Sequence, residues 1–295
     1  MDRPVVRILP LLLLIASLRE LPLQAAASRP VVPAKSASQA PAAPQGPSAD
    51  GAPAPTSTGA STAKTAQQWM AEGLQAQKAG KQLDAIRDFL NAQRLEPASP
   101  DPLYSLGMSF FLIGWYENET SYYDRAARHF DAALALDSQH DRAVFMLGMM
   151  EVVHFRLKQA EPYFLKAISL NPRNPYYHLH YGILLGRMNK PDDAIQQMLL
   201  AEKLGPTYPQ SYLNLGQLYA QLGKYADARP HLERAVHLGP NLASGYYSLG
   251  GVYHHLGLTE EAKSAYETFQ RLRAAQPQAD PVEDAMQGGS GAHSK

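Results

Sequence analysis

Apolar residues follow a helical spacing through most of this chain, and they recur in matched pairs of segments. In residues 209–242 the first segment carries apolar or small side chains at Tyr212, Leu215, Gly216 and Tyr219, and the second at Tyr225, Ala228, Leu232 and Ala235. Residues three and four apart lie on one face of a helix. A turn signal at Gly223 separates the segments, and Pro240 follows the second. The pattern therefore predicts a hairpin of two helices.

The same pattern recurs every 34 residues between residues 66 and 276. The glycine of the first segment stands at Gly73, Gly107, Gly148, Gly182, Gly216 and Gly250, with one step of 41. The predicted copies are 66–99, 100–140, 141–174, 175–208, 209–242 and 243–276. Small residues that recur in phase indicate that two helices approach closely. A larger side chain at Gly182 should therefore overpack the contact and cost about 1 to 3 kcal/mol.

This arrangement resembles the tetratricopeptide repeat, most completely in "YLNLGQLYAQLGKYADARPHLERAVHLGP" from Tyr212 to Pro240. The resemblance covers 211 of 295 residues. It implies an all-α fold, a right-handed superhelical solenoid of six helix-turn-helix hairpins. It also implies a concave groove, lined by the first helix of each repeat, that binds another protein or a peptide. Phe269 departs from the pattern, because the family has a small residue there.

The N-terminal residues have the layout of a secretory signal peptide, predicted for residues 1–27. Basic residues precede an apolar run from Ile8 to Leu18, and small residues follow up to Ala27. A bilayer-spanning helix needs about 20 apolar residues. The run is shorter and is interrupted by Pro10, so an uncleaved membrane anchor is the lesser alternative and no integral span is expected after cleavage.

Composition limits the remaining segments and the partners. Residues 28–65 are rich in Ala, Pro and Ser and are predicted to be a disordered linker, and residues 277–295 a disordered tail. Basic and acidic residues number 27 each, which argues against a nucleic-acid partner. There is no cysteine, so neither disulfides nor thiol chemistry contribute. These features predict an exported bacterial protein, periplasmic or extracellular.

No arrangement of residues points to catalysis, a metal or another cofactor. The Gly-Lys pairs at 80–81 and 223–224 lack the preceding glycine and the following Ser or Thr of a phosphate loop. His178 and His180 are two apart and residues 254–255 are adjacent, so neither pair has the spacing of a helical metal site. A metal site built across repeats stays open. His178 is predicted to be a packed, hydrogen-bonded core residue.

The predicted partner-binding groove lies on repeats two and three, where the family's groove positions are apolar. The candidates are Tyr104, Met108, Phe111, Leu112, Phe145, Met149, Val152 and Val153. In one interpretation these side chains only pack between repeats. In the other they form an accessible site for an apolar or amphipathic segment of a protein or peptide, which methionine suits well. No repeat carries the Lys and Asn with which a subset of the family binds a terminal carboxylate.

The seven extra residues of the second copy are assigned to Trp115–Ser121, with Gly114 as the usual turn glycine. The insert is predicted to lengthen the turn within that hairpin and to place Trp115 and Tyr116 at the groove rim. They either cover their own hairpin or serve as a binding hot spot.

The predicted function is a non-enzymatic scaffold or adaptor in the cell envelope that binds a protein or peptide. The alternative is a glycan-binding or polysaccharide-export accessory subunit, in which Tyr and Trp contact sugar.

Overall fold

The computed structural model describes residues 64–275, and within them twelve α-helices follow one another without a strand. The helices form six consecutive pairs: α2 (Ala66–Lys78) with α3 (Gln82–Leu95), α4 (Pro100–Glu117) with α5 (Thr120–Leu136), α6 (Asp141–Val153) with α7 (Leu157–Leu170), α8 (Pro175–Arg187) with α9 (Pro191–Leu204), α10 (Pro209–Gln221) with α11 (Tyr225–Leu238), and α12 (Ala243–His255) with α13 (Thr259–Ala275). The predicted all-α solenoid of hairpins is confirmed. The predicted signal peptide, the tail and residues 28–63 of the predicted linker lie outside the described residues.

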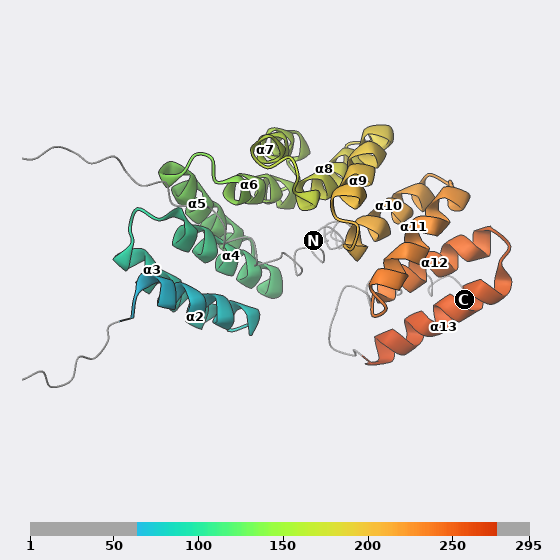
Figure 1. Cartoon of the computed structure of the whole chain (residues 1–295), viewed down its shortest axis with the longest axis horizontal. Helices are drawn as coiled ribbons and strands as arrows, with labels where there is room; N and C mark the ends of the chain where they lie inside the picture. Colours follow the sequence, from blue (N-terminus) through green and yellow to red (C-terminus); the bar gives the residue numbers. More distant parts are fainter. Residues whose placement is uncertain (1–63, 276–295) are drawn as a thin grey trace, which may run out of the picture.

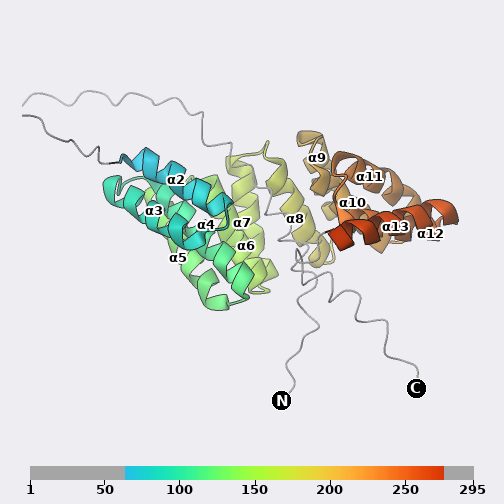
Figure 2. The ribbon, with the colours of Figure 1, turned by 90° about the horizontal axis from the view of Figure 1, so that it is seen from below.

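The pairs are stacked in sequence order. Among the described helices, every extensive contact joins the two members of a pair or two neighbouring pairs. The stack bends into an arch, with α2 at one end and α13 at the other (Figure 1). Figure 2 shows the same order along the long axis. Each repeat therefore depends on its neighbours to bury its apolar surface.

Small residues lie where the two helices of a pair cross. A Cβ atom on Gly182 would lie 2.8 Å from Cγ of Met198 and 3.0 Å from the carbonyl oxygen of Ala194. The recurring alanines of the second helices are all buried: Ala85, Ala126, Ala160, Ala194, Ala228 and Ala262. The predicted close approach of the helices is confirmed.

The first helix begins with a complete cap. The Thr65 side chain accepts a hydrogen bond from the backbone N–H of Gln68 at 3.2 Å, and the Gln68 side chain accepts one from the backbone N–H of Thr65 at 2.8 Å. This reciprocal pair satisfies two N–H groups that the helix itself leaves free. The ammonium group of Lys64 lies 4.3 Å from the centre of the Trp69 ring. The last two residues of the predicted linker are thus part of the folded solenoid.

Five of the seven extra residues of repeat two are helical, so the prediction that they lengthen the turn is wrong. The helix α4 has 18 residues, whereas the other first helices have 13, and α5 has 17. Only Asn118 and Glu119 remain between them. Asn118 adopts the left-handed conformation with φ of 52°, and the N–H of Glu119 donates to the carbonyl of Gly114 at 3.1 Å. The insert therefore lengthens both helices.

Gly114 is a packing residue inside α4 and not the turn glycine that the spacing predicted. It is buried, and a Cβ atom there would lie 3.1 Å from Cβ of Tyr122 and 3.1 Å from the ring of Tyr123. The missing side chain lets α5 lie close against the extended part of α4. A larger residue at Gly114 would therefore push α4 and α5 apart.

Candidate partner-binding surface

Six of the eight predicted groove residues belong to the hydrophobic core: Tyr104, Phe111, Phe145, Met149, Val152 and Val153. Phe145 shows the reason, because only 1% of it is exposed. Its ring stacks on Tyr177 of the next repeat at 4.9 Å and meets the edge of Phe164 at 5.4 Å. The expectation that these six side chains form an accessible groove wall is wrong. The packing interpretation describes them.

Met108 and Leu112 are the two candidates that stay partly exposed while resting on the core. Trp115 is also partly exposed and rests on the core. Leu112 follows Met108 by four residues on α4, and Trp115 follows Leu112 by three. They therefore form one stripe along the helix. Tyr116 continues the stripe, and 56% of it is exposed.

The first helix of repeat one extends this surface. Met70 and Leu74 of α2 are partly exposed and pack against the same core. One turn further along α2, the side-chain amide of Gln77 donates to the hydroxyl of Ser109 on α4 at 2.9 Å. The two apolar rows are therefore neighbours. We call Met70, Leu74, Met108, Leu112, Trp115 and Tyr116 the α2–α4 stripe.

Met70 and Leu74 were not among the predicted site residues, although they occupy the first repeat's groove positions. They keep their exposure because no described helix precedes α2, whereas α6 has neighbours on both sides. Among the predicted groove residues, the accessible apolar ones thus lie on repeat two, and Met70 and Leu74 of repeat one adjoin them. The 34-residue repeat pattern, together with the place of α2 at the end of the described stack, could have identified Met70 and Leu74.

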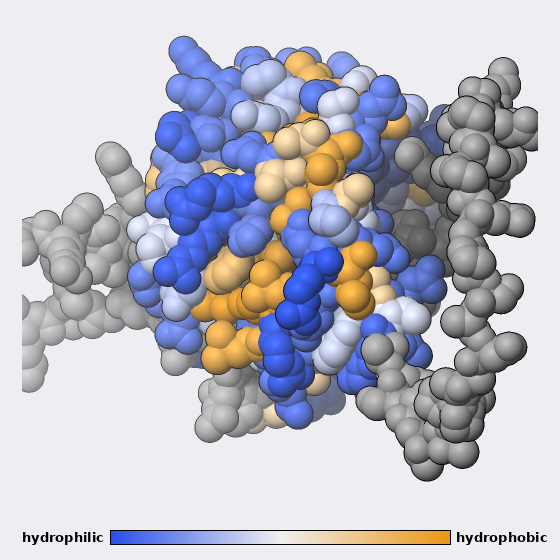
Figure 3. All heavy atoms as spheres, turned by 90° about the vertical axis from the view of Figure 1, so that its left-hand side faces the viewer, coloured by the Kyte–Doolittle hydropathy of each residue, from blue (hydrophilic) through white to orange (hydrophobic). Residues whose placement is uncertain are grey.

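Trp115 and Tyr116, the predicted rim pair, have different surroundings. Trp115 packs on the core, and Tyr116 projects from the part of α4 that the insert adds. Seen from the end that holds the first repeats, apolar atoms gather in the middle of the face and polar atoms surround them (Figure 3). The insert therefore adds an exposed aromatic side chain to an end of the molecule that already presents apolar surface.

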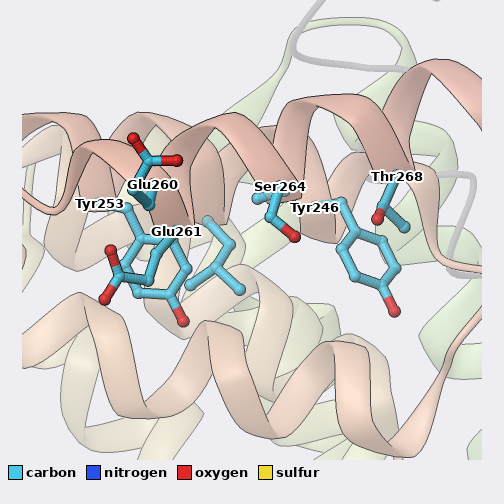
Figure 4. A pocket seen from close by; sticks show the side chains of 8 residues that line it. Tyr246, Tyr253, Glu260, Glu261, Ser264 and Thr268 are labelled. Carbon is cyan, nitrogen blue, oxygen red and sulfur yellow. The ribbon is translucent and has the colours of Figure 1, made fainter.

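A pocket of about 440 Å³ lies between α12 and α13 in the sixth repeat. Tyr246 and Tyr253 reach into it from α12, and the side chains of Glu260 and Glu261 stand at the first turn of α13 (Figure 4). The Tyr253 hydroxyl donates to the carboxylate of Glu233 at 2.9 Å. Carboxylates at a helix N-terminus suit the helix dipole. The polar groups named here thus have structural roles, in a hydrogen bond between helices and at the N-terminus of α13.

The histidines of α8 are structural. His178 is buried, and its two ring nitrogens lie 2.9 Å from the side-chain oxygen of Gln197 and 2.9 Å from the carbonyl of Pro172, as predicted for a hydrogen-bonded core residue. Burial lowers the pKa of His180 to about 3, so this side chain is neutral near pH 7.

Within residues 64–275 no group of three potential ligand side chains is arranged to hold a metal ion. The helices of the same range also include none that combines the length and the apolar character of a membrane span.

Comparison with known families identifies the class of this fold. A family model described as tetratricopeptide repeat matches residues 119–175 and 213–280, and a second model with the same description matches residues 163–196. Up to residue 275, these matches lie on the helix pairs described above. The chain is a tetratricopeptide repeat protein.

Solved structures with the same fold share about a fifth of their residues with this chain. The Cut9–Hcn1 hetero-tetramer of the APC/C has a TM-score of 0.64 at 20% identity, over 75% of this chain and 42% of that chain. Pseudomonas aeruginosa pilF has a TM-score of 0.58 at 20% identity, over 75% and 96%. TTC0263, a thermophilic TPR protein of Thermus thermophilus, has a TM-score of 0.54 at 21% identity, over 64% and 98%. No curated protein sequence matches the chain.

Proposed function

We propose that this protein is a non-enzymatic scaffold or adaptor that holds a protein or peptide partner on the α2–α4 stripe. The observation that carries the proposal is the continuous row of partly exposed apolar side chains on two adjacent first helices, ending in the exposed Tyr116. Contiguous apolar surface on a protein marks interaction sites.

The residue types of the stripe suit a segment of another chain. Met70 and Met108 have flexible, polarisable side chains that adapt to different apolar partners. Trp115 and Tyr116 offer large contact area with few rotatable bonds. The spacing of Met108, Leu112 and Trp115 repeats that of one face of an amphipathic helix, so an amphipathic helix or an apolar extended segment fits along α4.

We also propose that the protein acts outside the cytoplasm, in the cell envelope. The support is the composition of residues 1–27, with basic, apolar and small-residue parts in the order of a signal peptide. N-terminal sequencing of the protein purified from its native cells tests this. A mature chain that begins at Ser28 supports export, and an intact Met1 in the cytoplasmic fraction contradicts it.

Selection from a random peptide library on the immobilised full chain tests the binding proposal. We expect enrichment of peptides with several apolar residues at helical spacing. The variants Tyr116→Ser and Leu112→Gln should each weaken binding of an enriched peptide about tenfold, since central aromatic and aliphatic anchors contribute about 1 to 2 kcal/mol or more.

Leu222→Gln is the matched control, because Leu222 is an exposed leucine in the turn after α10 and lies outside the stripe. Its affinity for the peptide should equal that of the wild type. Equal binding by Tyr116→Ser, Leu112→Gln and the control would rule out the stripe. Saturable binding of a soluble oligosaccharide, with no enrichment of apolar peptide sequences, would favour a glycan ligand instead.

A further inference from the structure

Two energetically unfavourable features lie side by side where the first helices of repeats three and four end. The first is Phe155, in the turn between α6 and α7, which has φ of 59° and is 53% exposed. The other repeats place glycine or asparagine in the left-handed position of this turn: Gly80, Asn118, Asn189, Gly223 and Gly257. The left-handed backbone conformation is strained for a bulky residue. The exposed ring also lacks part of the contacts that a buried ring would make.

The second feature is Arg187, the last residue of α8. Its guanidinium carbon lies 6.0 Å from the centre of the Phe155 ring. The side chain is partly buried, and its Nη1 atom is buried without a hydrogen-bond partner. Among the arginines and lysines of residues 64–275, it is the one with such a nitrogen. Desolvation lowers the pKa of Arg187, and no nearby carboxylate opposes that effect.

Two basic side chains close in sequence to Phe155 and Arg187 are already paired. Arg156 bonds Glu151 with a shortest nitrogen-to-oxygen distance of 2.6 Å, and Lys190 bonds Glu161 at 3.2 Å. The Arg187 guanidinium has no such carboxylate partner. A single guanidinium matches a carboxylate, which carries one negative charge and accepts two parallel N–H donors.

We propose that Arg187 and Phe155 form a site for an acidic side chain of the partner, with the Phe155 ring against an apolar residue beside that acid. This proposal rests on the proposed function and adds the chemistry of the partner segment. Equivalent positions of successive repeats follow one another along a solenoid, so Arg187 lies along the stack from Leu112, its counterpart two repeats earlier. A segment that begins on the α2–α4 stripe and runs toward repeat four would bring its acid to Arg187.

A short peptide of defined sequence tests the site directly. The full-length, ¹⁵N-labelled protein is titrated with acetyl-Leu-Glu-Leu-amide, and the side-chain Nε–Hε signal of Arg187 is followed by NMR. The signal is assigned by its absence in Arg187→Gln, which should fold normally because it removes a partly buried charge. We expect a saturable shift of this signal. Arg229, which already bonds Glu233 at 2.7 Å, should not respond.

Acetyl-Leu-Gln-Leu-amide is the matched probe, and it should leave the Arg187 signal in place. Phe155→Asn should lower the affinity for the acidic probe severalfold while keeping the turn conformation. The site is overturned if the acidic probe causes no shift, if both probes cause the same shift, or if inorganic phosphate binds more tightly than the acidic probe.

The same variant separates this proposal from the proposed function. For a library-selected peptide that contains an acid, Arg187→Gln should lower affinity about tenfold, and the Glu→Gln form of that peptide should bind both proteins alike. If Tyr116→Ser has no effect but the probe still saturates Arg187, the stripe fails and the acid site stands. If Tyr116→Ser weakens binding and the Arg187 signal never shifts, the acid site fails and the stripe stands.

Discussion

The third and sixth repeats follow the same 34-residue pattern, but different shares of their residues are buried. Their first helices are both 13 residues long, yet ten residues of α6 are buried and four of α12. At the fifth residue of each repeat, Phe145 is 1% exposed and Tyr247 is 51% exposed. The third repeat belongs to a core that runs through repeats one to four, whereas the sixth shares a smaller cluster with repeat five.

The difference shows that place in the stack, more than residue type, determines what a repeat position does. Both Phe145 and Tyr247 are aromatic residues at the same place in the frame. The third repeat has neighbours on both sides, and no described helix follows α13. Stability in a stack of this kind is a sum of terms within repeats and between neighbours. We therefore expect the sixth repeat to open before the third.

The largest expected effect is that of truncating the buried aromatic side chain. Phe145→Ala should lower the free energy of unfolding by about 3 to 5 kcal/mol, because it leaves a cavity between α6, α7 and α8. Tyr247→Ala should cost about 1 kcal/mol or less, since half of that ring is in water. Urea denaturation of both variants measures the comparison. Similar losses would show that the two repeats are equally well packed.

A second pair of substitutions concerns helix packing. On Gly148, a Cβ atom would lie 3.0 Å from Cβ of Tyr163, so Gly148→Val should cost about 1 to 3 kcal/mol. On Gly251 of α12, the nearest atom to a Cβ would be the hydroxyl of Tyr266 at 3.7 Å. There Gly251→Ala should raise stability by about 1 kcal/mol through helix propensity. Thermal melting of the two proteins should shift in opposite directions.

The third prediction concerns pH. Folding lowers the pKa of His180 to about 3, whereas an unfolded imidazole titrates near about 6.5. Above pH 6.5 the side chain is neutral in both states. As the pH falls below 6.5, the unfolded state takes up a proton and the folded state does not, so stability is lost. The loss approaches about 1.4 kcal/mol per pH unit.

Urea midpoints at pH 7.5 and pH 5.5 test this loss. The decrease should be smaller in His180→Met than in the wild type. His254→Met, at an exposed site near the end of α12, should keep the wild-type decrease. Equal slopes in all three proteins would show that other groups cause the acid sensitivity.

The smallest expected effect is at the turns. Phe155→Asn should leave stability unchanged or raise it by about 1 kcal/mol, because asparagine tolerates the left-handed conformation better. In the sixth repeat the turn residue is Gly257, with φ of 76°, so Gly257→Ala should lower stability by a similar amount. A loss of stability in Phe155→Asn would mean that the ring's contacts outweigh the backbone strain.

The hairpins could be predicted from the sequence because their signals are local. Gly182 faces Met198 and Ala194 from the neighbouring helix of the same hairpin, and recurring residues at helical spacing are enough to predict such a contact. The insert could not be placed in this way. Gly114 has the turn position by count, but α4 continues through it, and α5 packs against the space that its missing side chain leaves.

The candidate site was predicted only in part, for a related reason. Leu112 and Val153 occupy the same frame position, and one remains partly exposed while the other is buried. The repeat frame identifies which face of a helix points toward the groove. It does not indicate how closely one hairpin packs on the next, and that packing decides whether a side chain on this face is exposed.

The sequence by itself determined the helices, their pairing and the small residues at their crossings, because each depends on neighbours within about 34 residues of chain. The tertiary structure alone decided which apolar side chains remain accessible and which arginine nitrogen, within residues 64–275, is buried without a hydrogen-bond partner. Burial at Phe145 or Arg187 depends on how adjacent repeats pack, and that packing results from many side chains acting together.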